Sequence, residues 1–465
     1  MRTGRCTLSA DESGRVLDRL TALEQVIPPA AVRQALQATG RVNLRACRLT
    51  HEVMLWVVLA MGLLTQVPIV GVFELARRLR KYEKTPDRSS LCVARQRLGI
   101  APIRHLFEQT VRPLATPQTP GAFYQGWRLM GIDGSVFDVP DSEANAHAFG
   151  KPSGGRGEGA RPQIRKLSLV ELGTHVEVAF VVRGIKQPKS GEQSLVPGLL
   201  RHLQPDMVVL WDRNFFSYRL WKMLVGTGAQ IVARVSARLV LRPIQHLADG
   251  SYLAKLYPCE SERNKDRQGI VVRVIRYKLN DPQRVGHGEE HVILTTLLDA
   301  QQSPAKEVIL LYHERWEVEL VYDEQKTHQD PPRPTKPAHL RSETPQGVLQ
   351  ELYALSLGHF VVRALMVAAA QGENLDPDRL SFTGCLQVLQ CRLPECPTHS
   401  PAAIADWYEG LLWALSQKRT DDAVRRNRIN PRVVRVKMSK FKKKRPEHRG
   451  LPPLTKTFAE TIVMT

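Results

Sequence analysis

The order of hydrophobic and polar positions in the first 122 residues is typical of short helices separated by turns. Pro28, Gly40 and Pro68 mark the turns, because proline and glycine commonly start or end helices. The expected helices cover residues 11–26, 28–39, 53–64 and 69–81. We therefore predict a helical N-terminal domain at residues 1–122.

From residue 128 onward the pattern changes to short runs that are rich in Val, Leu, Ile and Phe and bounded by Gly or Pro, as β-strands are. Helix-length segments separate the later runs, and strands that alternate with helices indicate an α/β domain with a mixed sheet. We place this domain at residues 123–330. The strand-like runs occupy residues 128–140, 166–184, 207–216 and 229–237, and the helical segments occupy 193–203 and 218–225.

Residues 238–300 add further strand-like runs around a polar loop, and we interpret them as an inserted β subdomain. After a proline-rich break, a long apolar helix is expected at 344–370. We predict a helical C-terminal region, residues 331–465, with a basic tail. The tail, residues 425–449, holds twelve Lys or Arg against one Glu, a net charge of +11.

The whole chain is strongly basic, with a formal net charge of +20 and a pI near 9.9. Such a charge attracts polyanions or an anionic membrane surface, and nucleic acid is the expected partner. The 465 residues, 43% of them hydrophobic and 24% charged, are sufficient for two or three globular domains. The basic stretch from Arg77 to Arg97 makes the helical N-terminal domain, residues 1–122, a predicted DNA-binding domain, and the tail is a second candidate DNA-binding surface.

Cysteine usage and the apolar runs argue against a secreted or membrane protein. Seven cysteines without a CxxC pair favour a reducing compartment. No signal peptide is evident, and the twelve-residue apolar run at 53–64 is shorter than the about 20 residues of a membrane span. Four potential zinc ligands lie close together in the sequence, but their spacing matches no common zinc motif: Cys385, Cys391, Cys396 and His399. We therefore expect these cysteines to be packed thiols and not metal ligands.

One predicted helix carries ionisable residues along one side. Tyr312, Arg315, Glu319 and Lys326 stand at offsets of 0, 3, 7 and 14, which fall within an arc of about 60° on an α-helix. This face combines an acid, two cations and a phenol. On spacing alone, a surface helix with an Arg315–Glu319 ion pair is the simpler interpretation.

The same helical pattern assigns the neighbouring side chains. Trp316 and Leu320 lie beside the ionisable face, so we expect them to dock the helix on the core. We place Glu317, Asp323 and Glu324 outside the site.

Two aspartates adjoin apolar strands and are candidate partners of Glu319. Asp133 lies inside the run 128–140, and Asp212 closes the run MVVLWD. A buried acid is costly unless it is paired or bound to a metal, and converging carboxylates can hold the two metal ions that phosphodiester hydrolysis uses. The structural alternatives are an Asp-Gly turn at Asp133 and a helix N-cap at Asp212. Three nearby acids compete for the role of Asp133: Asp138, Asp141 and Glu143.

The glycine-rich basic segment at 151–166 lacks the GK[ST] of a nucleotide-binding P-loop. We expect instead a mobile loop whose cationic side chains touch DNA phosphates: Arg156, Arg161, Arg165 and Lys166.

Together these features resemble the DDE transposases of the insertion-sequence-four family, and the resemblance runs from the helical N-terminus to the basic tail. The family signature Y-x2-R-x3-E-x6-K is complete as Tyr312, Arg315, Glu319 and Lys326. The segment DGSVFDVPDSEANAHAFG is similar to the first-aspartate motif of the family, and LWDRNFFSY is similar to the second. Asn214 stands where the family usually has Gly, which asparagine can replace in a left-handed conformation.

The resemblance implies a ribonuclease-H-like core at roughly 123–330, with a mixed sheet interrupted by the β insertion. It also implies two Mg²⁺ ions in the site, for which Mn²⁺ can substitute. The implied metal ligands are Asp133, Asp212 and Glu319, and the implied contacts to the transposon end are Tyr312, Arg315 and Lys326.

The implied activity is cut-and-paste DNA transposition. Such an enzyme binds the terminal inverted repeats of an element, cleaves the ends by hydrolysis, and transfers the 3′-hydroxyl ends into target DNA. The implied protein is a homodimer on double-stranded DNA, in the bacterial cytoplasm and associated with the nucleoid. The alternatives are a ribonuclease-H-like nuclease without strand transfer and a non-catalytic DNA-binding protein.

Overall fold

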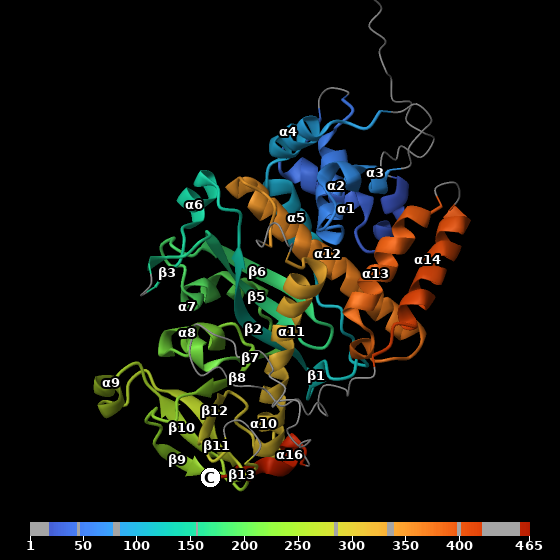
Figure 1. Ribbon diagram of the computed structural model, residues 1–465. Coiled ribbons are helices and arrows are strands. Elements are labelled where there is room, and N and C mark those ends of the chain that lie inside the picture. The colour runs from blue at the N-terminus through green and yellow to red at the C-terminus, as the bar shows by residue number, and fades with distance from the viewer. Residues whose placement is uncertain are drawn as a thin grey trace, which may run out of the picture.

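The computed structural model describes residues 18–43, 47–77, 84–154, 157–282, 287–332, 339–397, 401–420 and 456–465. A helical part lies at the top of Figure 1, the central sheet lies in the middle, and an extension of the sheet lies at the bottom. The expected basic tail at 425–449 and three predicted surface cations, Arg78, Arg80 and Lys81, lie outside the described residues.

Helices form the N-terminal part, in agreement with the hydrophobic pattern. Two of them begin at capping side chains: Thr50 Oγ1 accepts from Val53 N at 3.1 Å, and Asp87 Oδ1 accepts from Ser90 N at 2.8 Å. The apolar run lacks a polar face because its helix, α2, is buried along nearly its whole length. The elements are η1 (Asp18–Gln25), α1 (Pro29–Ala38), α2 (His51–Leu63), α3 (Ile69–Ala76), α4 (Arg88–Leu98) and α5 (Ala101–Thr110).

Arg95, which the sequence suggested as part of a DNA-binding stretch, turns inward. Its Nη1 lies 3.2 Å from Glu351 Oε1, and its Nη2 donates to Gly347 O at 2.7 Å. Both partners belong to the long helix α12 (Pro345–Gly372). This cation therefore ties the N-terminal helices to α12, and Arg95 was wrongly counted among the surface charges.

One mixed sheet organises the rest of the chain. Its strands are β1 (Phe123–Tyr124), β2 (Trp127–Asp138), β5 (Gln163–Glu171), β6 (Val176–Gly184), β7 (Met207–Trp211), β8 (Gln230–Val235), β9 (Pro243–His246), β10 (Tyr252–Leu256), β11 (Ile270–Leu279), β12 (His291–Thr295) and β13 (Ile462–Met464). The order is β6-β5-β2-β7-β8-β12-β11-β10-β9, and β2, β7 and β8 run parallel. Every residue of β7 is buried, as in parallel strands covered on both faces. The predicted α/β mixed sheet is confirmed.

The strands of the β insertion extend this same sheet. β12 pairs antiparallel with β8, and β11, β10 and β9 follow in order. β13 pairs with β11, and the short helix α16 (Phe458–Thr461) that precedes it packs beside α10 (Ala305–His313) (Figure 1). The Phe458 ring stacks on the His313 ring with centroids 4.3 Å apart. The C-terminal region, expected to be helical, thus also supplies a strand and a contact next to Tyr312.

The N-terminal helices and the C-terminal helices share one hydrophobic core, in which α2 crosses α12. A Cβ at Gly62 would lie 1.9 Å from Ala354 O, and a Cβ at Gly358 would lie 2.8 Å from Gly62 O. The two backbones therefore touch at a point where only glycine fits. α13 (Phe382–Arg392) and α14 (Pro401–Ser416) pack on the same helix. The domain boundaries at 122 and 331 stay a prediction.

Helix α12 is long and apolar enough to cross a membrane by length and composition alone. However, 83% of its most apolar window is buried inside the protein, which is the environment of a core helix.

Shorter elements connect these layers. The helix expected at 193–203 is divided because Pro197 lacks an N–H and is followed by Gly198. The short elements are α6 (Glu143–Phe149), β3 (Ser153–Gly154), β4 (Gly157–Glu158), α7 (Glu192–Leu195), η2 (Val196–Gly198), η3 (Leu200–His202), η4 (Arg213–Phe215), α8 (Tyr218–Val225), α9 (Glu260–Asn264), η7 (Pro377–Arg379) and η8 (Leu393–Glu395).

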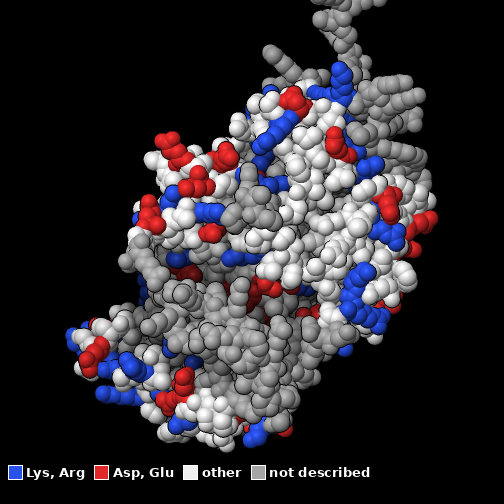
Figure 2. Space-filling model, viewed as in Figure 1, with Lys and Arg blue, Asp and Glu red and all other residues white. Residues whose placement is uncertain are grey.

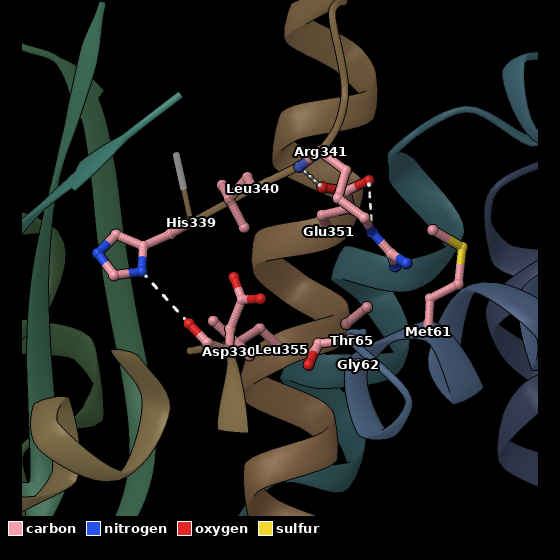
Figure 3. Close-up of a pocket in the computed structure, with 10 residues that line it drawn as sticks. Met61, Gly62, Thr65, Asp330, His339, Leu340, Arg341, Glu351 and Leu355 are labelled. Carbon is pink, nitrogen blue, oxygen red and sulfur yellow. Dashed lines mark hydrogen bonds and ion pairs between the residues drawn. The ribbon is translucent and has the colours of Figure 1, made fainter. Parts of the chain in front are cut away.

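A small cavity lies where α2, Asp330, residues 339–341 and α12 meet (Figure 3). Arg341 N donates to Glu351 Oε2 at 2.6 Å, and His339 Nδ1 lies 3.4 Å from Asp330 O. None of the six predicted site residues lines this cavity. It belongs to the packing of α2 on α12.

Candidate active site

The parallel pairing of β2 with β7 brings the two predicted aspartates together. Ile132 is the register partner of Trp211, so the residues that follow, Asp133 and Asp212, stand side by side. Asp133 lies within β2, and the Asp-Gly turn considered for it does not form. Asp212 ends β7 and accepts a hydrogen bond from Arg213 N at 2.6 Å, so it also caps η4.

The signature residues lie on one helical path that changes its winding. α10 passes into the 3₁₀ turn η5 (Glu314–Trp316), then into α11 (Glu317–Asp323), and then into the π-helical turn η6 (Glu324–Gln329). Tighter and looser turns shift the angular positions that a regular α-helix would give. The side chains of Val318 and Val321 face the core, whereas Trp316 and Leu320 are half-buried, so their predicted docking role was wrong.

Glycine in β2 allows α11 to lie close to the strand. A Cβ at Gly131 would lie 2.3 Å from Val318 Cγ2 and 2.8 Å from Leu172 Cδ2. Tyr322 Oη donates to Asp133 O at 2.6 Å, which ties the same helix to the aspartate backbone. These contacts place Glu319 on the helix directly beside the strand that carries Asp133.

Arg315 connects the acids of the site. Its Nη1 lies 3.4 Å from Asp133 Oδ2, and its Nη2 lies 3.5 Å from Glu319 Oε1. The Arg315 side chain is 5% exposed, that of Asp133 is 21% exposed and that of Glu319 is 44% exposed. The guanidinium is therefore a buried cation beneath two more accessible carboxylates, and its plane also covers the Trp316 ring at 4.4 Å.

Burial and neighbouring charges act in opposite directions on the pKa values of Asp133 and of Arg315. Burial raises the pKa of the Asp133 carboxyl to about 6, while Arg315 and the Gly134 N–H act to lower it. Burial alone would lower the pKa of Arg315, but the pKa is raised because Tyr312 and the acids Asp133, Asp212 and Glu319 surround it. All three predicted acids thus act on one guanidinium.

Tyr312 and Lys326 are more enclosed than residues of an open DNA-binding face. Burial raises the pKa of the Tyr312 phenol, Arg315 acts to lower it, and nearby Asp212 adds to the rise. The Lys326 ammonium donates to Val136 O at 2.8 Å and to Ser135 Oγ at 3.2 Å. Burial lowers the pKa of Lys326. In this structure the ammonium braces β2 two to three residues beyond Asp133.

The donor set suits a divalent cation. Asp133 within β2, Asp212 directly after β7 and Glu319 on α11 supply carboxylate oxygens, the ligands that hard divalent cations prefer. Arg315, which now compensates these carboxylates, shows that the site concentrates negative charge. Asp133, Asp212 and Glu319 therefore fit a metal-binding role by donor chemistry.

A set of buried charges that the sequence pattern did not predict lies behind this site. Glu317 and Glu324, which we had placed outside it, are only 6% and 7% exposed. Lys166, expected to touch DNA from a mobile loop, is fully buried on β5 and bonds Glu177 at 2.7 Å, so that expectation was wrong. No local pattern reveals these partners, because they come from distant parts of the chain.

His175, Glu317 and Asp378 offer ligand atoms within 4.8 Å of one another, all buried. However, the two His175 nitrogens lie 2.9 Å from Glu317 and 3.0 Å from Glu324, so both ring nitrogens already have carboxylate partners in the protein. We assign no metal to it.

Comparison with known proteins identifies the family. The transposase DDE domain model matches residues 128–354, and the insertion element 4 transposase N-terminal model matches residues 17–108. The transposase InsG for insertion sequence element IS4 of Escherichia coli (strain K12) is 28% identical over 438 residues, which cover 91% of this chain and 93% of that protein. The chain belongs to the DDE transposases of the insertion-sequence-four family. It is a DNA-binding enzyme that cleaves DNA and transfers strands.

Two further similarities are weaker. The putative transposase InsZ of Escherichia coli (strain K12) is 26% identical over 203 residues, which cover 43% of the transposase described here and 66% of InsZ. Among solved structures, the piggyBac transposase synaptic complex with hairpin DNA covers 90% of each chain, with a TM-score of 0.44 and 11% identity. The mixed sheet and the DDE domain match agree with a ribonuclease-H-like fold.

Proposed function

We propose that the transposase cuts the ends of an insertion sequence and joins them to target DNA at the site formed by Asp133, Asp212 and Glu319. The observation that carries this proposal is the convergence of Asp133, Asp212 and Glu319 on Arg315, from two parallel strands and one helix. The three acids are the proposed ligands of two Mg²⁺ ions, with Mn²⁺ as a substitute.

When bound, two divalent ions activate the attacking oxygen and stabilise the leaving oxygen of a phosphodiester. The protein residues prepare the place for this chemistry. Asp133 and Asp212 are fixed by the strand pairing, and Glu319 is fixed by the packing of α11 on β2. A preorganised set of carboxylates needs little rearrangement when the ions and DNA arrive.

The cations of the signature are the proposed DNA contacts. Arg315 presents two N–H groups to carboxylates in this structure, and the same fork can bind a phosphate oxygen pair. Tyr312 adds a phenol close to Asp212, and Lys326 adds a positive charge beyond Asp133. These three side chains would hold the scissile phosphate against the acids.

The proposed reaction has two balanced steps. Water attacks a phosphodiester at the end of the element, so one P–O bond forms, one breaks, and a 3′-hydroxyl is released. That hydroxyl then attacks a target phosphodiester and displaces a new 3′-hydroxyl, so one ester replaces another. The second step needs no external energy source.

The proposed partners follow from charge and architecture. Lys and Arg side chains appear over both the helical part and the sheet extension on the face shown in Figure 2. Double-stranded DNA, comprising the terminal inverted repeats and the target, is the proposed ligand of these surfaces. We further propose a homodimer on DNA, with one active site for each end, in the cytoplasm close to the nucleoid.

The test uses purified full-length protein and a duplex oligonucleotide that carries the DNA bordering the reading frame. Asp133→Asn, Asp212→Asn and Glu319→Gln should each lower cleavage at least about a thousandfold, with DNA affinity changed less than about threefold. Asp323→Asn, an exposed acid on the same helix, is the matched control and should cleave normally. Parental cleavage by all three variants would contradict the assignment of these acids to the active site. Cleaved DNA without joined products would favour a nuclease that does not transfer strands.

A further inference from the structure

The side of the signature helix that faces away from Glu319 holds two carboxylates inside the protein. Glu317 is 6% exposed and Glu324 is 7% exposed, and these residues lie two positions before and five positions after Glu319. Buried carboxylates are costly unless charged and hydrogen-bonding partners surround them. Their partners therefore define what this side of the helix is built to do.

Glu324 is held from three directions. Its Oε2 lies 2.8 Å from His359 Nε2 and accepts from Arg363 Nε at 3.0 Å, and its Oε1 lies 3.0 Å from His175 Nδ1. Arg363 Nη2 also pairs with Oε1 and lies 2.6 Å from His175 Nδ1. Because His359 and Arg363 lie on α12 and His175 lies in the turn after β5, Glu324 joins the signature helix to both layers.

Glu317 extends this cluster toward the start of α11. Its Oε2 lies 2.9 Å from Nε2 of the same His175 ring. One imidazole therefore bridges two carboxylates that stand seven residues apart along the signature helix. His175 reaches them from a backbone φ of 59°, a left-handed conformation that non-glycine residues seldom adopt.

A second buried cluster fixes the next residue, Gln325. Lys166 Nζ donates to Gln325 Oε1 at 3.0 Å, and Gln325 Nε2 donates to Glu177 Oε2 at 3.1 Å. Lys166 Nζ also donates to Ser356 Oγ of α12 at 2.9 Å. Ser168, which bonds Glu177, is the register partner of Asp133, so this cluster lies behind the strand residue that carries the first acid.

Together the two clusters hold consecutive residues at the start of the π turn. Consecutive residues of a helix point about 100° apart, so bonds to both resist rotation as well as sliding. Apolar side chains would fill the same space with less desolvation, but they would not select one rotation of the helix. The directional hydrogen bonds and ion pairs of the two clusters select one rotation of the helix. In that rotation Glu319 and Arg315 point toward Asp133.

We propose that Glu324, together with His175 and Arg363, is a positioning residue that sets the rotation of the signature helix and thereby the divalent-cation affinity of Glu319 and Asp133. This inference rests on the proposed metal-binding role of those acids. Glu324 itself does not touch the ion or the DNA. It acts by holding the helix from the buried side.

The test is Glu324→Gln in the full-length protein, with Asp323→Asn as the matched control. Gln keeps the size of the side chain and removes its charge, and Asp323 is the adjacent residue with a side chain 54% exposed. The primary readout is Mn²⁺ binding, measured from free Mn²⁺ by electron paramagnetic resonance without DNA. We expect Glu324→Gln to weaken Mn²⁺ binding and to slow cleavage by about 10- to 100-fold, as for other supporting residues around metals, with DNA binding unchanged. Asp323→Asn should match the parent.

A double variant separates positioning from simple stability. Glu324→Gln with Arg363→Met removes both charges, so no uncompensated ion stays buried and the melting temperature should recover relative to Glu324→Gln alone. We expect Mn²⁺ affinity to stay low in this variant because the rotation of the helix is no longer selected. Recovery of Mn²⁺ affinity together with the melting temperature would overturn the proposal, as would parental Mn²⁺ binding by Glu324→Gln.

If Glu324→Gln does not fold, Glu317→Gln tests the positioning role of the cluster instead. This residue contacts the same His175 ring, so we expect Mn²⁺ binding weaker by about threefold or more, whereas parental Mn²⁺ binding would contradict the proposal. Failure of the proposed function is seen separately, because Glu319→Gln would then bind Mn²⁺ and cleave like the parent. In that case the acids, and not the positioning cluster, would be misassigned.

Discussion

Arg315 Nη1 lies 3.4 Å from Asp133 Oδ2, although the two residues are 182 positions apart in the chain. The same guanidinium lies 3.5 Å from Glu319 Oε1. One buried cation therefore spans a strand and a helix that both carry proposed metal ligands.

Arg315→Lys should keep a positive charge but lose the planar pair of N–H groups. We expect cleavage to fall by about tenfold or more, because an ammonium cannot bind two carboxylates or a phosphate through a fork. Mn²⁺ affinity should change little, since the ligands stay in place. Single-turnover cleavage and a Mn²⁺ titration measure the two effects, and a parental cleavage rate would remove Arg315 from the DNA-contacting set.

Gly131→Ala should push α11 away from β2. The new Cβ would meet Val318 Cγ2 at 2.3 Å, and overpacking of this kind costs about 1–3 kcal/mol of unfolding free energy. Cleavage should fall as Glu319 moves away from Asp133. The double variant Gly131→Ala with Val318→Ala removes the clashing methyl and should regain part of the cleavage rate. If the double variant is slower than Gly131→Ala alone, close packing is not the reason for this glycine.

His359 makes stability depend on pH in the acid range. Burial lowers the pKa of His359 from 6.5 to about 3, with Glu177 opposing and Lys166 adding to the shift. Below pH 6.5 the unfolded chain binds a proton that the folded chain excludes, so the unfolding free energy falls as the pH drops from 6.5 toward 3. Between pH 7.0 and 5.5 this residue should account for a loss of about 1 kcal/mol.

Urea denaturation of the parent and of His359→Gln at these two pH values measures that loss. The parent should lose about 1 kcal/mol more than the variant between pH 7.0 and 5.5, since glutamine does not titrate. Equal losses would mean that the pKa of His359 is the same in the folded and the unfolded protein, which would contradict the lowered pKa.

Lys166→Met should destabilise the fold without altering the electrostatics of DNA binding. The substitution leaves Glu177 buried without its cation, which typically costs about 3–5 kcal/mol. Adding Glu177→Gln should restore much of this loss. The slope of log Kd against log salt concentration should stay parental in Lys166→Met, whereas Arg161→Ala, at a less buried position in the same basic segment, should lower the slope by about one. A lower slope of log Kd against log salt concentration in Lys166→Met would mean that this lysine contacts DNA after all.

The hydrophobic pattern predicted the elements that depend on burial alone. The helix expected at 344–370 is observed at 345–372, and the apolar run at 53–64 is a buried helix that ends at Leu63. The strands β2, β5, β6, β7 and β8 also fall within the predicted runs or within a few residues of them. The local pattern predicts these elements because the hydrophobic positions of each element are the ones that it buries in the core.

The geometry of the site depended on information that is not local. Asp133 and Asp212 become neighbours only through the register of two parallel strands, which neither segment specifies. A regular helix gave Trp316 and Leu320 the docking role, but the buried residues of α11 are Val318 and Val321, which lie on another side of the helix. The family signature marked the residues, but only the fold shows how they face one another.

Charged residues were the least predictable. Lys166, Glu317 and Glu324 look like surface residues in the sequence, since charged side chains are seldom fully buried. Their partners lie 149 positions away for Glu324 and His175, and 190 positions away for Lys166 and Ser356. Burial of a charge depends on such distant partners, so no window of sequence contains the evidence for it.

The close contact between Gly62 and Gly358 fixes the position of α2 on α12. α2 and α12 touch backbone to backbone, and α12 also holds the signature helix through Arg363, so these contacts oppose movement of the N-terminal helices relative to the proposed active site. If the N-terminal helices bind DNA as predicted, we expect the distance from a bound base to the cut bond to be fixed by this packing. One extra base pair between them would move that bond by about 3.4 Å and turn it by about 35° around the DNA axis, out of register with the acids.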